Sequence, residues 1–117
     1  MPPVAVGAGG VVSTASDLSR FMYAQYSPPE WLAEALSQVH TPHVQISEDV
    51  WQGLGWYVKE SHDNYNNIVW HNGQTGGYRS FMGVNLNREL GITVLINQGL
   101  EQSLATRLEG CVAEFLV

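Results

Sequence analysis

The sequence predicts an α+β fold in which helices flank an antiparallel sheet. Apolar residues at helical spacing, with helix start signals, occur in residues 1–50 and again near the chain end. From residue 51 onward, short extended apolar runs are separated by polar or glycine-containing turns. Turns this short join antiparallel strands, because parallel strands need a long crossover. We therefore expect one domain over 1–117, with a helical segment at 1–50 and strands plus a final helix at 51–117.

Two helices are expected in the first segment. Thr14 and Asp17 have the spacing of a capping box and predict a helix near 14–25. Ser27 precedes a Pro-Pro pair and Glu30, which indicates a second helix start with Ser27 as its N-cap. Pro42 then ends this second helix. The apolar face of the first helix comprises Leu18, Phe21 and Met22, followed by Gln25.

The extended runs predict strands near 54–59, 67–71, 77–85 and 91–97. We expect the strand ending at His71 to lie beside 78–85, and 78–85 to lie beside 92–97. A last helix near 102–116 should cover one face of this sheet. Its apolar stripe is expected to comprise Leu104, Leu108, Cys111, Val112, Phe115 and Leu116.

Buried packing is the expected role of several isolated residues. Trp31 and Trp56 fall on patterns that would bury them, and Cys111 is read as a small core residue. Since Cys111 is the single cysteine, no internal disulfide can form. The alternatives are an aromatic platform for a glycan, and a zinc site involving His40 and His43 with His62 and His71 further on. The platform is less favoured because Trp31 and Trp56 are expected in the core, and the zinc site because no complete ligand pattern accompanies the histidines. No metal or cofactor is expected.

Charge and hydropathy exclude several partner classes. The net charge is −6, and the five basic residues are not clustered, which disfavours nucleic acid and anionic membranes as partners. No apolar stretch approaches the roughly 20 residues that span a bilayer. The first residues lack the basic start of a secretory signal, and the sequence does not indicate a cellular compartment.

The most informative stretch is 70–78, where an apolar strand meets a glycine-rich turn with His71 at the junction. His71-Asn72-Gly73 resembles the third motif, Lys-Thr-Gly or His-Thr-Gly, of the serine β-lactamase and penicillin-binding-protein family. Residues 9–18, 52–56 and 89–97 resemble further family landmarks in the family's order. Residues 52–56 in particular resemble the strand as class C β-lactamases, D-Ala-D-Ala peptidases and family esterases carry it. The resemblance implies the C-terminal portion of that fold, a partial domain.

The family nucleophile is a serine followed three residues later by a lysine. The single lysine is Lys59, and Trp56 stands three residues before it, so the sequence has no Ser-x-x-Lys motif. Tyr65 and Asn67 match the second motif, but their place suggests a hairpin loop. We therefore expect a C-terminal fragment of a serine hydrolase, inactive alone, whose relatives perform acyl transfer on amides, lactams or esters. The alternative is a noncatalytic binding or assembly module that acts through a partner chain.

The resemblance implies roles for five residues. His71 would act electrostatically, on a substrate carboxylate or on the missing serine and lysine. Asn72 replaces the threonine that contacts substrate, and Gly73 keeps the groove open to substrate backbone. The backbone N–H of Gln74 would be one of two oxyanion donors, and Thr75 would contact substrate.

Four further expectations concern exposure, the glycine pair, the substrate and self-association. His71, Asn72 and Gln74 should be reachable by solvent, because burying clustered polar groups is costly. Gly76 and Gly77 are read either as a turn with positive φ or as a route for substrate. The partner would be a small-molecule or peptide substrate if an N-terminal part complements the chain. Without that part, an exposed strand edge and apolar sheet face should cause self-association.

Overall fold

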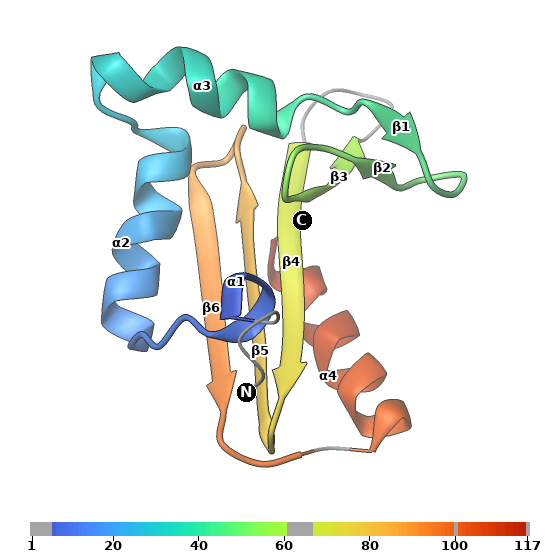
Figure 1. The fold of residues 1–117 in the computed structure, drawn as a ribbon. Coiled ribbons are helices and arrows are strands. Elements are labelled where there is room, and N and C mark those ends of the chain that lie inside the picture. The colour runs from blue at the N-terminus through green and yellow to red at the C-terminus, as the bar shows by residue number, and fades with distance from the viewer. Residues whose placement is uncertain (1–5, 61–66, 100, 117) are drawn as a thin grey trace.

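The computed structural model describes residues 6–60, 67–99 and 101–116. Within them, the strands form a single antiparallel sheet, and helices lie on both of its faces (Figure 1). The strands follow one another across the sheet in chain order, β1-β2-β3-β4-β5-β6. The helices are α1 (Val6–Gly9), α2 (Ala15–Tyr26), α3 (Glu30–His40) and α4 (Gln102–Phe115). The strands are β1 (Val44–Gln45), β2 (Trp51–Gln52), β3 (Tyr57–Glu60), β4 (Asn67–Thr75), β5 (Tyr78–Asn85) and β6 (Leu90–Ile96). The predicted α+β architecture is thus observed.

The long strands β4, β5 and β6 form the centre of the molecule. The β4–β5 ladder runs from Ile68 opposite Asn85 to Thr75 opposite Tyr78, and β5 pairs with β6 along all of β6. Gly76 and Gly77 alone form the β4–β5 turn, with φ of 48° and 86°. Such a two-residue turn needs positive φ at both positions, which glycine adopts without strain. The expected strand neighbours and the turn interpretation of this glycine pair are confirmed.

Two strand predictions are wrong in their bounds. β4 does not end at His71 but continues to Thr75, because residues 72–75 all pair with β5. The strand expected at 54–59 begins only at Tyr57. Residues 53–56 instead form a tight turn between β2 and β3, in which the Gly53 amide donates to the Trp56 carbonyl oxygen at 2.7 Å.

The helix starts show how local signals compete. α2 begins as predicted, with Thr14 Oγ1 accepting a hydrogen bond from the Asp17 amide at 3.1 Å. The predicted start at Ser27 is wrong, because Ser27 ends α2 by donating its amide to the Tyr23 carbonyl oxygen at 3.0 Å. α3 begins at Glu30. Pro29, and not Ser27, stands at the N-cap of α3.

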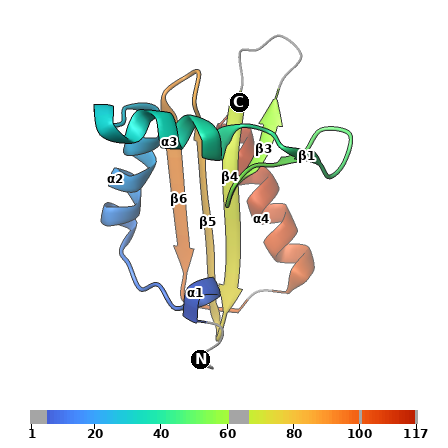
Figure 2. The same cartoon turned by 45° about the horizontal axis from the view of Figure 1, so that its top comes forward.

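Each face of the sheet has its own apolar cluster. On one face, Met22 of α2 packs with Trp56 and with strand residues Val58, Val69 and Val84. On the other face, α4 packs against the sheet through the cluster Ile68, Phe81, Val112 and Leu116. Figures 1 and 2 show α2 and α4 on opposite sides of β5, with α3 crossing near one end of the sheet. The expected uncovered sheet face is therefore not observed.

The predicted burial of Trp31, Leu104, Cys111 and Phe115 is wrong, whereas that of Trp56, Val112 and Leu116 is confirmed. Trp56 is 6% exposed as expected, whereas Trp31 at the start of α3 is 80% exposed. Cys111 is exposed, and Phe115 is 72% exposed. The apolar side chains of α4 are only partly buried because the residues that contact the sheet form a narrower stripe than the apolar positions do. That stripe comprises Ala105, Leu108, Val112 and Leu116.

Asn85 fixes the end of α4 to the sheet. It is fully buried, and its Nδ2 donates to the Leu116 carbonyl oxygen at 2.5 Å. Its Oδ1 accepts from the amides of Asn87 and Arg88 at 3.2 and 3.1 Å. A buried amide with its groups satisfied stabilises this corner. None of the helices in the described ranges has the length and apolar character that a membrane crossing requires.

Candidate active site

One edge of β4 is open over its second half. β3 pairs only with Asn67 to Trp70 of β4, so residues 71–75 have no strand on that side within the described ranges. We call residues 71–75 the open edge. Figures 1 and 2 show β3 beside only one end of the longer β4. An open edge presents backbone donors and acceptors that an extended ligand can use.

The ladder pattern shows which backbone groups point outward. The Leu86 amide donates to the Asn67 carbonyl oxygen at 2.8 Å, so Asn67 uses its carbonyl toward β5. Bonded and non-bonded pairs alternate along an antiparallel ladder. Residues 69, 71, 73 and 75 therefore bond to β5, whereas the N–H and C=O groups of Asn72 and Gln74 point to the open edge. The Gln74 amide, the predicted oxyanion donor, thus points to the open edge.

His71 lies beside this edge with an exposed side chain. Its Nδ1 lies 2.6 Å from the Asn72 carbonyl oxygen. A carbonyl oxygen only accepts, so Nδ1 carries the proton and Nε2 is the acceptor in the neutral ring. The ring stacks on Tyr57 with a centroid distance of 5.6 Å, and Tyr57 also contacts Trp70 at 4.7 Å. Tyr57, the first residue of β3, thus stands where the open edge begins.

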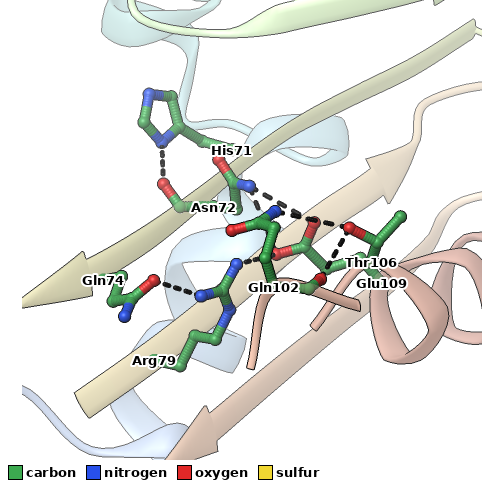
Figure 3. Close-up of polar contacts among 7 residues, drawn as sticks. All are labelled: His71, Asn72, Gln74, Arg79, Gln102, Thr106 and Glu109. Atoms are coloured by element: carbon green, nitrogen blue, oxygen red, sulfur yellow. Dashed lines mark hydrogen bonds and ion pairs between the residues drawn. The ribbon is translucent and has the colours of Figure 1, made fainter. Parts of the chain in front are cut away.

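The Asn72 side chain does not project toward the open edge. Its Nδ2 donates to both carboxylate oxygens of Glu109 in α4, at 3.2 and 3.3 Å (Figure 3). Side chains alternate along a strand, so His71 and Asn72 point to opposite faces of the sheet. The structure therefore places the His71 side chain next to the Asn72 backbone. The side chains of His71 and Asn72 lie on opposite faces of the sheet.

Gln74 shares the α4 face with Asn72. Its Oε1 accepts a hydrogen bond from Arg79, which lies directly opposite it in β5. Arg79 Nη2 lies 3.5 Å from a Glu109 carboxylate oxygen. The Arg79 side chain is only 8% exposed and that of Glu109 is 23% exposed. Figure 3 shows this four-residue cluster, with Gln102 and Thr106 of α4 bonded to each other nearby.

Sequence reasoning missed Arg79 and Glu109. An arginine within an otherwise apolar strand is a signal for a buried partner, because arginine is almost never buried unpaired. The partner could not be identified, since Glu109 lies 30 positions later, in a helix that also carries Glu114. The prediction that His71, Asn72 and Gln74 are reachable by solvent is confirmed, with His71 and Gln74 exposed and Asn72 half-buried.

Gly73 and Thr75 complete the open edge. A Cβ atom at Gly73 would lie 2.8 Å from Ser80 Oγ, so glycine relieves a cross-strand contact at this position. Thr75 is exposed and closes the hairpin opposite Tyr78. The expected substrate contacts of these two residues remain predictions.

The other histidines that the structure describes, His40 and His43, have structural partners. His40 Nε2 lies 2.8 Å from Gln25 Oε1, and burial lowers the pKa of His40 below its ordinary value. His43 Nε2 lies 3.1 Å from the Gln38 carbonyl oxygen. No group of three metal-ligating side chains occurs in the part of the chain that the structure describes. Residues 61–66, which include His62 and most of the Tyr-x-Asn match, lie outside that part.

Comparison with known proteins supports the resemblance. The family model described as Beta-lactamase matches residues 1–110, which covers nearly the whole chain. No curated protein matches the chain.

Proposed function

Because the chain belongs to the β-lactamase family, we propose that β4 forms the substrate-contacting wall of a serine hydrolase site. The reaction is acyl transfer, in which a serine attacks an amide, lactam or ester and water resolves the acyl-enzyme. In this proposal, β4 contributes the third motif as His71-Asn72-Gly73, together with the amide of Gln74. The observation that carries the proposal is the open edge beside His71.

The open edge suits an extended acyl substrate. A ligand backbone can add to residues 72–74 as a further strand, using the outward groups of Asn72 and Gln74. The Gln74 amide is then available to stabilise the negative charge that develops on the carbonyl oxygen of the reacting bond. The His71 ring can hold a substrate carboxylate through a charge-assisted hydrogen bond.

The Asn72 side chain plays a different part from the family threonine. Its amide is bonded to Glu109, so substrate specificity depends on His71 and on backbone groups rather than on this side chain. We infer a substrate with an extended backbone and a terminal carboxylate, such as an acylated D-Ala-D-Ala peptide.

The nucleophile comes from outside these residues. The 117-residue sequence contains no Ser-x-x-Lys motif, so the serine and lysine must be supplied by another segment or chain. In this proposal the present chain is a C-terminal fragment that binds substrate weakly and does not turn it over by itself.

Substitutions at Gln74 test the proposal. Gln74→Pro removes the outward amide, whereas Gln74→Ala keeps that amide and loses the same side-chain bond to Arg79. Binding of an acylated D-Ala-D-Ala peptide is measured by calorimetry at millimolar ligand. We expect Gln74→Pro to bind at least about fivefold more weakly than Gln74→Ala, the loss of about one hydrogen bond. Equal affinities of these two variants would contradict a role for the amide.

His71 is tested with a matched histidine elsewhere. His71→Ala should weaken peptide binding by about tenfold, because a charge-assisted bond of about 1.5 kcal/mol is lost. His43→Ala is the control, since His43 is also exposed but directly precedes β1 and does not lie on β4. A larger loss in His43→Ala than in His71→Ala would place the carboxylate elsewhere.

A further inference from the structure

We propose that Arg79 and Glu109 are positioning residues, which hold the open edge in shape from the opposite face of the sheet. The proposal deepens the proposed function, because that function determines what the open edge binds. The positioning itself is a property of the free chain and can be measured without any ligand.

The geometry links one ion pair to both outward-facing residues. Asn72 and Gln74 are two positions apart on β4, so their side chains share the α4 face. Asn72 donates to Glu109, and Gln74 accepts from Arg79 (Figure 3). Arg79 and Glu109 in turn contact each other at 3.5 Å. The two residues whose backbone groups line the open edge are thus fixed by the same pair.

The open edge needs such a constraint. Residues 71–75 have a strand neighbour on one side only, and the following turn consists of two glycines. Strand ends of this kind open locally more easily than strands paired on both sides. The hydrogen bonds from the Asn72 and Gln74 side chains to Glu109 and Arg79 supply a second set of restraints on the α4 face. These restraints are present without a bound ligand.

Burial makes the arrangement resistant to movement. The Arg79 side chain is almost fully buried, and a buried guanidinium must keep its partners. Its Nε has no partner among the described residues, so Gln74 and Glu109 determine how the guanidinium lies. Glu109 is held in place because α4 is anchored by Val112 in the core and by the Asn85 bond to Leu116. α4 therefore sets the geometry of an edge that it does not cover.

The decisive variant removes the pair without leaving a buried charge. In Arg79→Met/Glu109→Leu, apolar side chains of similar length replace both partners, and such replacements often preserve stability. We expect the melting temperature to be retained while the backbone amides of Asn72 and Gln74 become mobile. By ¹⁵N relaxation, their order parameters should fall from the rigid range of about 0.85 toward 0.6.

Two comparisons separate positioning from general stability. Met22→Ala weakens the packing of α2 on the opposite face but leaves α4 and the pair intact, so the amides of Asn72 and Gln74 should stay rigid despite a lower melting temperature. Glu109→Gln, which keeps an acceptor for Asn72 and loses the charge, should mobilise Gln74 more than Asn72. Unchanged order at both amides in the double variant would overturn the proposal, as would equal mobility in Met22→Ala.

A ligand arm distinguishes this proposal from the proposed function. If the wild-type chain binds an acylated D-Ala-D-Ala peptide, the double variant should bind it at least threefold more weakly. If the wild-type chain shows no binding, the proposed function fails, and the relaxation data still decide the positioning role.

Discussion

Two glycines in neighbouring strands should respond differently to an added methyl group. A Cβ at Gly83 of β5 would lie 2.7 Å from Leu116 Cδ1 and 3.2 Å from Phe81 Cε1, both in the core beneath α4. A Cβ at Gly73 of β4 would meet only Ser80 Oγ, at 2.8 Å. The serine hydroxyl can rotate away, whereas the packed side chains in the core cannot.

The expected magnitudes differ accordingly. Overpacking makes Gly83→Ala less stable by about 1–3 kcal/mol. Gly73→Ala loses a few tenths of a kcal/mol through Ser80 and regains about 0.5 kcal/mol from the lower entropy of the unfolded chain, so its net change is near zero. At about 4 °C per kcal/mol for a domain of this size, the melting temperature falls by about 4–12 °C in Gly83→Ala and by less than about 2 °C in Gly73→Ala.

Thermal unfolding followed by far-ultraviolet circular dichroism measures both changes, and urea unfolding checks them at constant temperature. Gly110→Ala is the control, because a Cβ there meets nothing within 4 Å and helical alanine should raise stability. Gly73→Ala/Ser80→Ala should behave like Gly73→Ala. If Gly73→Ala is as destabilising as Gly83→Ala, the open edge is packed more tightly than the structure indicates, and the steric reasoning is refuted.

Three further predictions concern activity, pH and association. The purified chain should not hydrolyse chromogenic lactams or p-nitrophenyl esters above its His71→Ala variant, and an acyl adduct on any serine in an intact mass spectrum would disprove this. Burial lowers the pKa of His40 below 6.5, so the unfolded chain binds more protons and stability should fall as the pH drops below 6.5. His40→Gln should flatten that dependence, measured as melting temperature between pH 7 and pH 5, whereas an unchanged slope would exclude His40 as its source. The outer edge of β6 is uncharged over residues 90–96, so we expect the chain to associate with itself in sedimentation equilibrium. Leu95→Lys should reduce this association, and a single monomeric species at all concentrations would rule it out.

Local signals in the sequence predicted the elements that local interactions determine. The capping box of Thr14 and Asp17 places the start of α2, because the bond lies within one helical turn. α4 was predicted nearly to the residue from its apolar period. The order of β4, β5 and β6 followed from turns too short for any crossover.

The missed features depend on contacts between distant residues. Residues 72–75 of β4 contain a glycine and polar side chains, and only their pairing with β5 keeps them extended. Cys111 and Phe115 are apolar positions of α4, but which side of the apolar stripe faces the sheet depends on how the helix packs. The pairing of Arg79 with Glu109 joins a strand to a helix 30 positions away, which no local pattern encodes.

The central claim is that the open edge of β4 binds an extended acyl substrate. Titration of the ¹⁵N-labelled chain with an acylated D-Ala-D-Ala peptide tests it directly, with amide chemical shifts recorded at each ligand concentration. We expect saturable shifts that are largest at Asn72 and Gln74, with the amides of β6 unaffected. Largest shifts along β6, or no saturable shift at Asn72 and Gln74, would contradict the claim.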